Sequence, residues 1–185
     1  GADTADTTQI SIKTDFSQGN IRGTANSLDF AIHGNGFFKI STPNGIRFTR
    51  KGNFELDSQG LLVTQQGHMV MGKDGPITIS GTNISVNDDG TILADGAEAG
   101  RIEVVDFEKY DTLRKEGQGL FSNSTNEPEN QPSPDTRIKQ GYIESSNVNV
   151  ASEMVQMIRS LRKFESYQKA IQIIDELNRR AINDV

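Results

Sequence analysis

The stretch SSNVNVASEMVQMIRSLRKFESYQKAI, from Ser145 to Ile171, predicts a long amphipathic helix. Its apolar residues recur at intervals of three and four, so they gather along one side of a helix. Asn149 or Ser152 can cap the helix, and Glu153 lies in the first turn, where the helix dipole favours a negative charge. We therefore expect a coiled-coil-like assembly helix over residues 148–185.

Many apolar residues of this helix stand seven positions apart, which is the repeat of a coiled-coil seam. The seam residues are Met154 and Leu161; Met157, Phe164 and Ile171; and Tyr167, Ile174 and Ala181. Apolar residues outside the seam include Val155, Ile158, Ile173 and Leu177, so the apolar surface is broader than a two-stranded coiled coil requires. About 33 residues rising ~1.5 Å each form a rod of roughly 50 Å. A small β domain cannot cover that length, so packing against other helices is favoured over folding back as a core helix.

Upstream of the helix, short apolar runs alternate with polar residues, as in antiparallel strands. In LDFAIHGNGFFKI, Leu28–Ile40, two such runs flank a Gly-Asn-Gly turn and predict strand, turn and strand. Further turn signals stand at residues 43–45, 57–60, 73–75 and 87–90. We expect a mainly β protein, with a small antiparallel β domain of meander or barrel type over residues 15–147 and the long helix after it.

Two segments are expected to be less ordered. Residues 1–14 are polar and predict a loose N-terminal segment, and the opening Gly1-Ala2-Asp3 without an initiator Met suggests that residues are missing before it. Residues 122–136, SNSTNEPENQPSPDT, hold three of the five prolines and no large apolar residue. This composition predicts a flexible loop, because it buries too little surface to offset its ordering entropy.

Composition excludes several functions. The net charge of −6 and the pI near 5.0 argue against nucleic acid and anionic lipid as partners. No apolar run is long enough to span a membrane, and no secretory signal is visible. The chain has no cysteine, so disulfides and thiol chemistry are excluded.

Nothing in the sequence predicts catalysis. His33 and His68 are the only histidines, each beside glycine, and no third zinc ligand stands at a standard spacing. The turn at 87–90 lacks the glutamate of a calcium loop, and Asp106 and Glu108 have no surroundings typical of a glycosidase. We expect no enzyme activity, no catalytic residue, no cofactor, no metal and no small-molecule substrate.

Three blocks of the sequence strongly resemble the bacterial flagellar basal-body rod and hook family. They are FSQGNIRGTANSLDFAIHGNGFFKI, GIRFTRKGNFELDSQGLLVTQQGHMVMG and QGYIESSNVNVASEMVQMIRSLRKFESYQKAI, and the resemblance covers about Asp15 to Val185. The short β region and GKDGPITI are more similar to the proximal rod protein of F type than to the distal rod protein of G type.

The resemblance implies a structural subunit of the flagellar rod, the axial drive shaft of the basal body, which transmits torque and catalyses nothing. In this family an N-terminal and a C-terminal helix pair as an inner coiled-coil layer of a tube, and the β domain forms an outer layer. The implied partners are the N-terminal helix ahead of residue 1 and other rod and hook-basal-body subunits, in homo- and hetero-oligomers. The implied location is the periplasmic rod, after type III export without a cleaved signal peptide.

Individual residues also match the family. Asn147, Val148, Asn149 and Val150 match the segment that joins the β domain to the helix in members of the family. Its assembly-helix face corresponds to Met154, Met157, Ile158, Leu161, Phe164 and Ile171, and with Ile174 these form the expected assembly interface. One departure is Ala25, where the family often has glycine; alanine takes positive φ less readily, which argues against an identical turn.

The alternative function is a cell-surface β domain that binds polysaccharide and oligomerises through its tail. Such binding relies on aromatic platforms, for which Tyr110 and Tyr142 are the candidates, and the chain has no tryptophan.

Overall fold

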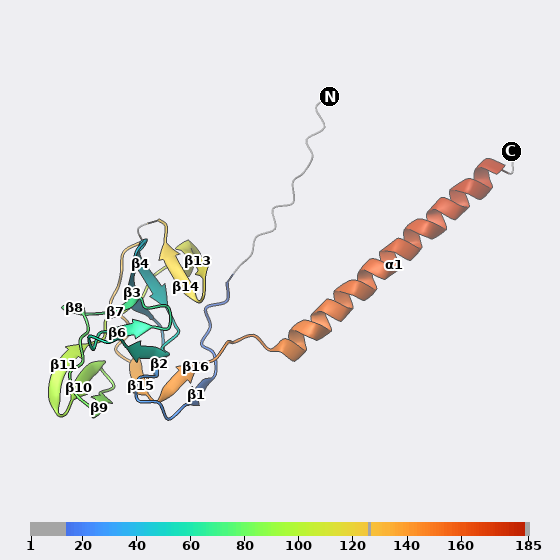
Figure 1. The fold of residues 1–185 in the computed structure, drawn as a ribbon. Helices are drawn as coiled ribbons and strands as arrows, with labels where there is room; N and C mark the ends of the chain where they lie inside the picture. Colours follow the sequence, from blue (N-terminus) through green and yellow to red (C-terminus); the bar gives the residue numbers. More distant parts are fainter. Residues whose placement is uncertain (1–13, 126, 184–185) are drawn as a thin grey trace. The chain divides into compact units, whose positions relative to one another are not determined.

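The computed structural model describes residues 14–125 and 127–183, and in them a β-rich region precedes one long helix (Figure 1). The chain divides into two units, one up to Asn147 and one from Val148 onward, and each is described by itself. Of the segment predicted to be loose, residues 1–13 lie outside the described residues. So do Asn126 in the predicted loop and residues 184–185 of the predicted helix.

The β-rich region consists of short strands and one turn of 3₁₀ helix, η1. The strands are β1 Ile21–Gly23, β2 Phe30–His33, β3 Phe37–Thr42, β4 Gly45–Thr49, β5 Phe54–Leu56, β6 Leu62–Thr64, β7 Met69–Gly72, β8 Gly75–Pro76, β9 Ile84–Val86, β10 Thr91–Ala94, β11 Ala97–Arg101, β12 Val104–Val105, β13 Leu113–Gly117, β14 Leu120–Asn123, β15 Arg137–Gln140 and β16 Tyr142–Glu144, and η1 spans Tyr110–Thr112.

A nine-stranded sheet is the largest element of this region. Its order is β13-β14-β4-β3-β7-β6-β5, with β12 paired to β3 and β8 to β7. Three smaller sheets have the orders β11-β10-β9, β15-β2 and β1-β16. The strands pair antiparallel throughout these sheets. The predicted fold class, mainly β and antiparallel with a long C-terminal helix, is confirmed.

The turns predicted at residues 43–45, 57–60, 73–75 and 87–90 each join two strands that pair with one another. The predicted strand, turn and strand of residues 28–40 are also present as β2 and β3, but these two strands do not pair. β2 pairs with β15, and β3 pairs with β4, β7 and β12. The chain therefore crosses from one sheet to another at Gly34-Asn35-Gly36, where both glycines have positive φ, 107° and 121°.

The core has two parts because successive residues of a strand point to opposite faces. Phe38 lies in the larger cluster, with Phe30, Ile40 and Val70 among its buried members. Its neighbour Phe37 lies in the other, which is mainly aromatic. That second cluster contains Phe37, Phe48, Val105, Phe107, Leu113 and Phe121, with Phe16 and Tyr110 packed against it. We call it the aromatic cluster.

The proline-rich segment 122–136 makes contacts along its described length. The side chain of Asn123 exchanges two hydrogen bonds with the backbone of Glu127, at 2.7 and 2.9 Å. Asn130 forms a β-bridge with Asp106, and the Thr136 hydroxyl donates to the carbonyl of Asn35 at 3.1 Å. The flexibility of this loop stays a prediction.

Helix α1 spans Val150–Asn183, 34 residues. Asn149 caps it, because its side-chain oxygen accepts hydrogen bonds from the N–H groups of Ala151 and Ser152, at 3.1 and 3.2 Å. Within the described residues no helix combines the length and the apolar content needed to cross a membrane.

Ala25 has a φ of 61°, the left-handed conformation that glycine adopts most readily. Alanine therefore adopts the positive φ that we expected it to avoid. The turn is held on both sides, since Thr24 donates to the carbonyl of Gly141 at 2.8 Å and Asp29 to that of Asn26 at 3.1 Å.

We expect Ala25→Gly to raise the free energy of unfolding by about 1 kcal/mol. The left-handed conformation costs alanine ~1–2 kcal/mol, which glycine avoids. Glycine also gives the unfolded chain more conformational freedom, and this offsets part of the gain in stability. Ala25 is exposed, so little packing is lost. The measurement is denaturant unfolding. The control is Ala97→Gly, at an exposed alanine in β11 without positive φ, which should lower stability by roughly 0.5–1 kcal/mol. Equal losses in both variants would contradict strain at Ala25.

Candidate functional site

The seven residues predicted for assembly all lie on α1 with their side chains uncovered. Their exposed fractions range from 52% for Ile158 to 72% for Met157. At about 100° per residue, five of them fall within an arc of roughly 100°, which forms one stripe. These five are Met154, Met157, Leu161, Phe164 and Ile171. Ile158 and Ile174 lie on opposite flanks of the stripe, so the structure does not gather all seven on one line.

Such a surface is unfavourable in water. Covering a large apolar side chain contributes about 1.5–3 kcal/mol, so a stripe of five provides a strong driving force for association. Helices in proteins also draw most of their stability from the packing of an apolar face rather than from intrinsic propensity. We call Met154, Met157, Ile158, Leu161, Phe164, Ile171 and Ile174 together the assembly face.

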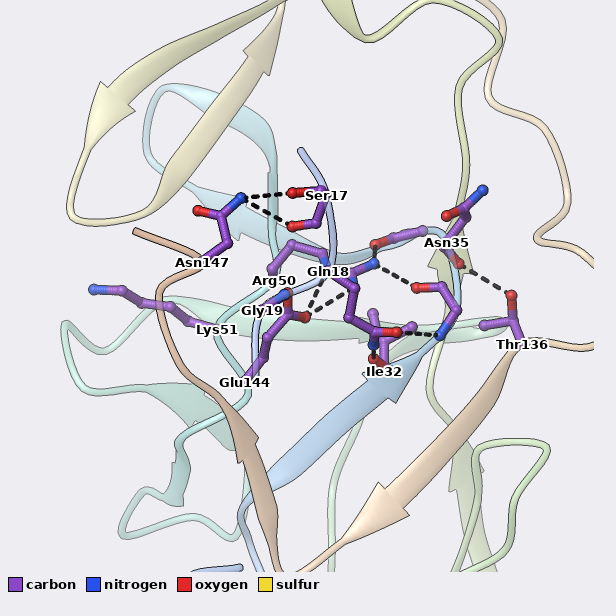
Figure 2. Close-up of polar contacts among 12 residues, drawn as sticks. Ser17, Gln18, Gly19, Ile32, Asn35, Arg50, Lys51, Thr136, Glu144 and Asn147 are labelled. Carbon is purple, nitrogen blue, oxygen red and sulfur yellow. Dashed lines mark hydrogen bonds and ion pairs between the residues drawn. The ribbon is translucent and has the colours of Figure 1, made fainter. Parts of the chain in front are cut away.

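The four predicted junction residues have different roles in the structure. Asn147 binds the beginning of the β region: its side-chain N–H group lies 3.1 Å from the carbonyl oxygen of Ser17 and 3.0 Å from the Ser17 hydroxyl (Figure 2). The carbonyl oxygen of Asp15 lies 3.2 Å from the same group. Asn149 caps α1, and Val150 is its first residue. Val148 stands between the two asparagines.

Asn147 thus joins two stretches that are distant in the sequence. We call residues 14–20 the incoming segment and residues 144–147 the outgoing segment. Strands β1 and β16, which adjoin them, pair with Ile21 opposite Glu144 and Gly23 opposite Tyr142. Ser145 donates to the carbonyl of Asn20 at 2.8 Å. The β region therefore begins and ends at one place.

Arg50, which follows directly after β4, lies beside this junction (Figure 2). Its Nε and Nη2 atoms lie 2.9 and 2.8 Å from one carboxylate oxygen of Glu144. Its Nη1 donates to the carbonyls of Gly34 and Gly36 at 2.8 and 2.7 Å. The other carboxylate oxygen of Glu144 accepts the N–H of Gly19 at 2.8 Å. We call these residues the Arg50 cluster; nothing in the sequence pattern identified it, because its charges are 94 positions apart.

The incoming segment is also held by packing and by a glutamine. Phe16 packs against Phe37, Tyr110 and Phe121, with ring centroids 5.2 to 5.9 Å apart. The side-chain N–H group of Gln18 donates to the carbonyl of Ile32 at 2.7 Å (Figure 2). Gly19 lies so close to the outgoing segment that an added Cβ would stand 1.9 Å from the carbonyl oxygen of Ser145. Only glycine fits there.

Tyr110 has the most clearly defined electrostatic environment of this region. Burial, together with the hydrogen bond that its hydroxyl donates to Asp106 at 2.6 Å, raises the pKa of Tyr110 to about 12. Asp106 also accepts the N–H of Phe107 at 2.8 Å. This carboxylate therefore serves the packing of η1 on the aromatic cluster.

The two histidines lie in different parts of the β region. His33 ends β2 opposite Arg137, and the backbone N–H of His68 donates to the Thr64 hydroxyl at 3.2 Å. Across residues 14–125 and 127–183, histidines and carboxylates form no group of three suited to a metal ion. A cavity of about 520 Å³ is lined by both signs of charge, so it favours neither anions nor cations. Its charged residues are Lys73, Arg101, Arg137, Asp88, Asp89, Glu103 and Glu129.

Two family models match the chain. Residues 31–94 match the flagellar hook protein FlgE/F/G D1 domain, and residues 139–184 match the flagellar basal body rod FlgEFG protein C-terminal region. The first match runs from β2 to β10. The second begins in β15 and includes the outgoing segment and α1, so the junction and the assembly face belong to one family element.

Curated relatives align along most of the chain. The flagellar basal-body rod protein FlgF of Caulobacter vibrioides is 36% identical over 174 residues, which cover 92% of this chain and 71% of that protein. FlgG of Bacillus subtilis is 35% identical over 93% of this chain and 70% of its own length. FlgF of Escherichia coli is 34% identical over 90% of this chain and 72% of its own length. Because both types match at similar identity, the preference for F type stays a prediction.

We expect Gly19→Ala to lower the free energy of unfolding by about 1–3 kcal/mol, since the added methyl group would overlap the Ser145 carbonyl and separate the two segments. Denaturant unfolding measures the loss. Gly23→Ala is the matched control in the neighbouring strand, because its Cβ would lie 3.7 Å from the Tyr142 ring, an ordinary contact. Similar stability of both variants would show that the close approach is not required.

We expect the protein to lose stability between pH 10 and pH 12 through Tyr110. Its pKa is raised from 10.0 to about 12 in the folded state, so its contribution is fully present below pH 10 and is lost as the pH rises through about 12. Unfolding free energies measured across this range should fall less steeply in Tyr110→Phe than in the wild type. Tyr142→Phe, outside the aromatic cluster, should retain the steep decline. The same slope in Tyr110→Phe as in the wild type would refute this assignment.

Proposed function

The chain belongs to the flagellar basal-body rod protein family, and from that premise we propose that it assembles through the exposed face of α1. The protein is a structural subunit of the flagellar rod, the axial drive shaft of the basal body. The observation that supports the proposal most directly is the assembly face itself, in which every side chain is more than half exposed.

The occupants of this face are helices of neighbouring subunits. The central stripe provides one helix-to-helix contact of the coiled-coil kind, and Ile158 and Ile174, on opposite flanks, provide contacts with further helices. The flanks of a two-stranded coiled coil usually bear charges, whereas these are apolar. This arrangement suits a layer of packed helices better than an isolated pair. The helix that the family resemblance implies ahead of residue 1 is a further occupant within the same subunit.

The partners are other rod and hook-basal-body subunits, in homo- and hetero-oligomers, and the location is the periplasmic part of the rod. Export proceeds without a cleaved signal peptide. The junction residues Asn147, Val148, Asn149 and Val150 connect the assembly helix to an outer β domain. The proposal assigns the chain no catalytic step, no cofactor, no nucleic acid and no small-molecule substrate. Its contribution is mechanical, through rigid helix packing that transmits torque.

One of the two aromatic residues that the polysaccharide-binding alternative requires, Tyr110, is not available for stacking on a sugar. The ring of Tyr110 packs edge-on against Phe37 at 5.8 Å and also contacts Phe16 at 5.3 Å, and its hydroxyl is bonded to Asp106. This ring is therefore engaged in the aromatic cluster and is not presented for stacking on a sugar. Tyr142, 42% exposed, is the remaining candidate.

We expect Leu161→Asp combined with Phe164→Asp to prevent rod assembly, because assembly would bury two unpaired carboxylates at a cost of several kcal/mol. Electron microscopy of purified basal bodies should show rods that are absent or cut short. Both side chains are exposed in the free subunit, so the unfolding of its β region should not change.

The control for this experiment is Ser166→Asp combined with Ala170→Asp, which adds the same charge outside the stripe, on the side of α1 that bears Val155, Ile173 and Leu177. Both residues are small and exposed, and rods longer than those of the Leu161 and Phe164 variant are expected. Normal rods and normal swimming in the Leu161 and Phe164 variant would refute the assembly face.

A further inference from the structure

We propose that Arg50 is the positioning residue that joins both ends of the β region to its main sheet and thereby transfers load between the assembly helix and the β domain. The claim that Arg50 joins both ends of the β region to the sheet rests on the contacts of the Arg50 cluster alone. The claim that this connection transfers load also rests on the proposed function. Any load that passes along the chain from α1 to the sheets must cross the outgoing segment, which Val148 and Asn149 join to the helix.

The outgoing segment has little regular structure to hold it. Strand β16 has three residues and pairs only with β1, also of three residues, in a two-stranded sheet. Two-stranded sheets are at best marginally stable by themselves. The side chain of Asn147 joins the two segments to each other and not to the nine-stranded sheet. The incoming segment reaches the nine-stranded sheet through Phe16, which packs against Phe37 and Phe121. The Arg50 cluster adds a polar connection from the outgoing segment to the end of β4.

Arg50 contacts three parts of the fold at once. Its backbone follows β4 in the nine-stranded sheet, its Nε and Nη2 bind Glu144 at the end of β16, and its Nη1 binds the two carbonyls of the crossing between β2 and β3. Through Glu144 the connection reaches Gly19 in the incoming segment. Figure 2 shows these contacts converging on the two side chains.

The chemistry of the cluster requires arginine. A planar guanidinium donates in several fixed directions, whereas lysine offers one nitrogen and could not reach the carboxylate and both carbonyls with the same geometry. The pair is also partly buried, with the side chains of Arg50 and Glu144 17% and 9% exposed. Among the described residues, the ion pairs of Lys39, Arg47 and Arg101 each involve a more exposed carboxylate. Removal of one partner of such a pair leaves the other charge shielded from water and uncompensated.

The first test is amide hydrogen exchange on the 185-residue chain with Arg50→Met. The amides of Gly19 and Ser145 should exchange at least about tenfold faster than in the wild type, while those of Ile40 and Val70 in the nine-stranded sheet should change less than about twofold. Arg50→Lys should restore part of the protection. Arg47→Met is the matched control, because Arg47 lies in β4 and pairs with the exposed Glu116, so the junction amides should keep their protection.

Glu144→Gln keeps the inference testable if Arg50→Met fails to fold. This variant retains the side-chain shape and removes the charge, and it should release the same amides by a smaller factor. Wild-type exchange at Gly19 and Ser145 in the variants that fold would overturn the inference. Equal acceleration at Gly19, Ser145, Ile40 and Val70 would also overturn it, because Arg50 would then be an ordinary stabilising residue.

The role of Arg50 in load transfer is tested in cells. Cells that carry Arg50→Met should assemble rods of full length, yet they should swim more slowly than cells that carry Arg47→Met in viscous medium, where the load is high. Released amides with unchanged swimming would refute the role in load transfer and leave the proposed function intact. Normal rods in cells that lack the whole chain would instead refute the proposed function, and the exchange data would still decide the structural role of Arg50.

Discussion

The antiparallel pairing of β1 with β16 places the beginning and the end of the β region side by side, and the contacts around Gly19, Glu144 and Asn147 depend on this constraint. Gly19 must be glycine because the outgoing segment passes so close to it. Glu144 can bind the incoming segment and Arg50 together only because the two strands are in register. The aromatic cluster then receives Phe16 at the same end of the region.

The two units of the chain differ in how far their apolar side chains are buried. The β region buries most of its large apolar residues internally, in two clusters, of which one contains Phe38 and the other Phe37. Helix α1 leaves its large apolar residues exposed, so its free energy is lowered only when another surface covers them. A rod subunit needs both properties, since a stable body must present a surface that is satisfied by assembly alone. Family membership and this exposed helix therefore agree on a structural function.

Much of the fold follows from short-range patterns. The seven-residue spacing of Met154, Leu161 and their neighbours predicts the helix and its apolar stripe, because helical periodicity acts over one or two turns. Alternation and turn residues predict the strands and the turns that join paired neighbours. The helix cap at Asn149 is likewise a local interaction, and it lies within the expected range. The sequence by itself therefore determined the fold class, the long helix and, through the quoted blocks, the family.

Only the tertiary structure decided which distant parts meet. β2 and β3 adjoin a glycine turn yet pair with other strands, since alternation specifies the face of a strand but not its partner. Ala25 takes positive φ because hydrogen bonds from both sides hold its turn, which outweighs the intrinsic preference of alanine. Arg50 and Glu144 form one cluster although 94 positions separate them. Contacts at such separation depend on the packing of the whole β region, and no local periodicity in the sequence records them.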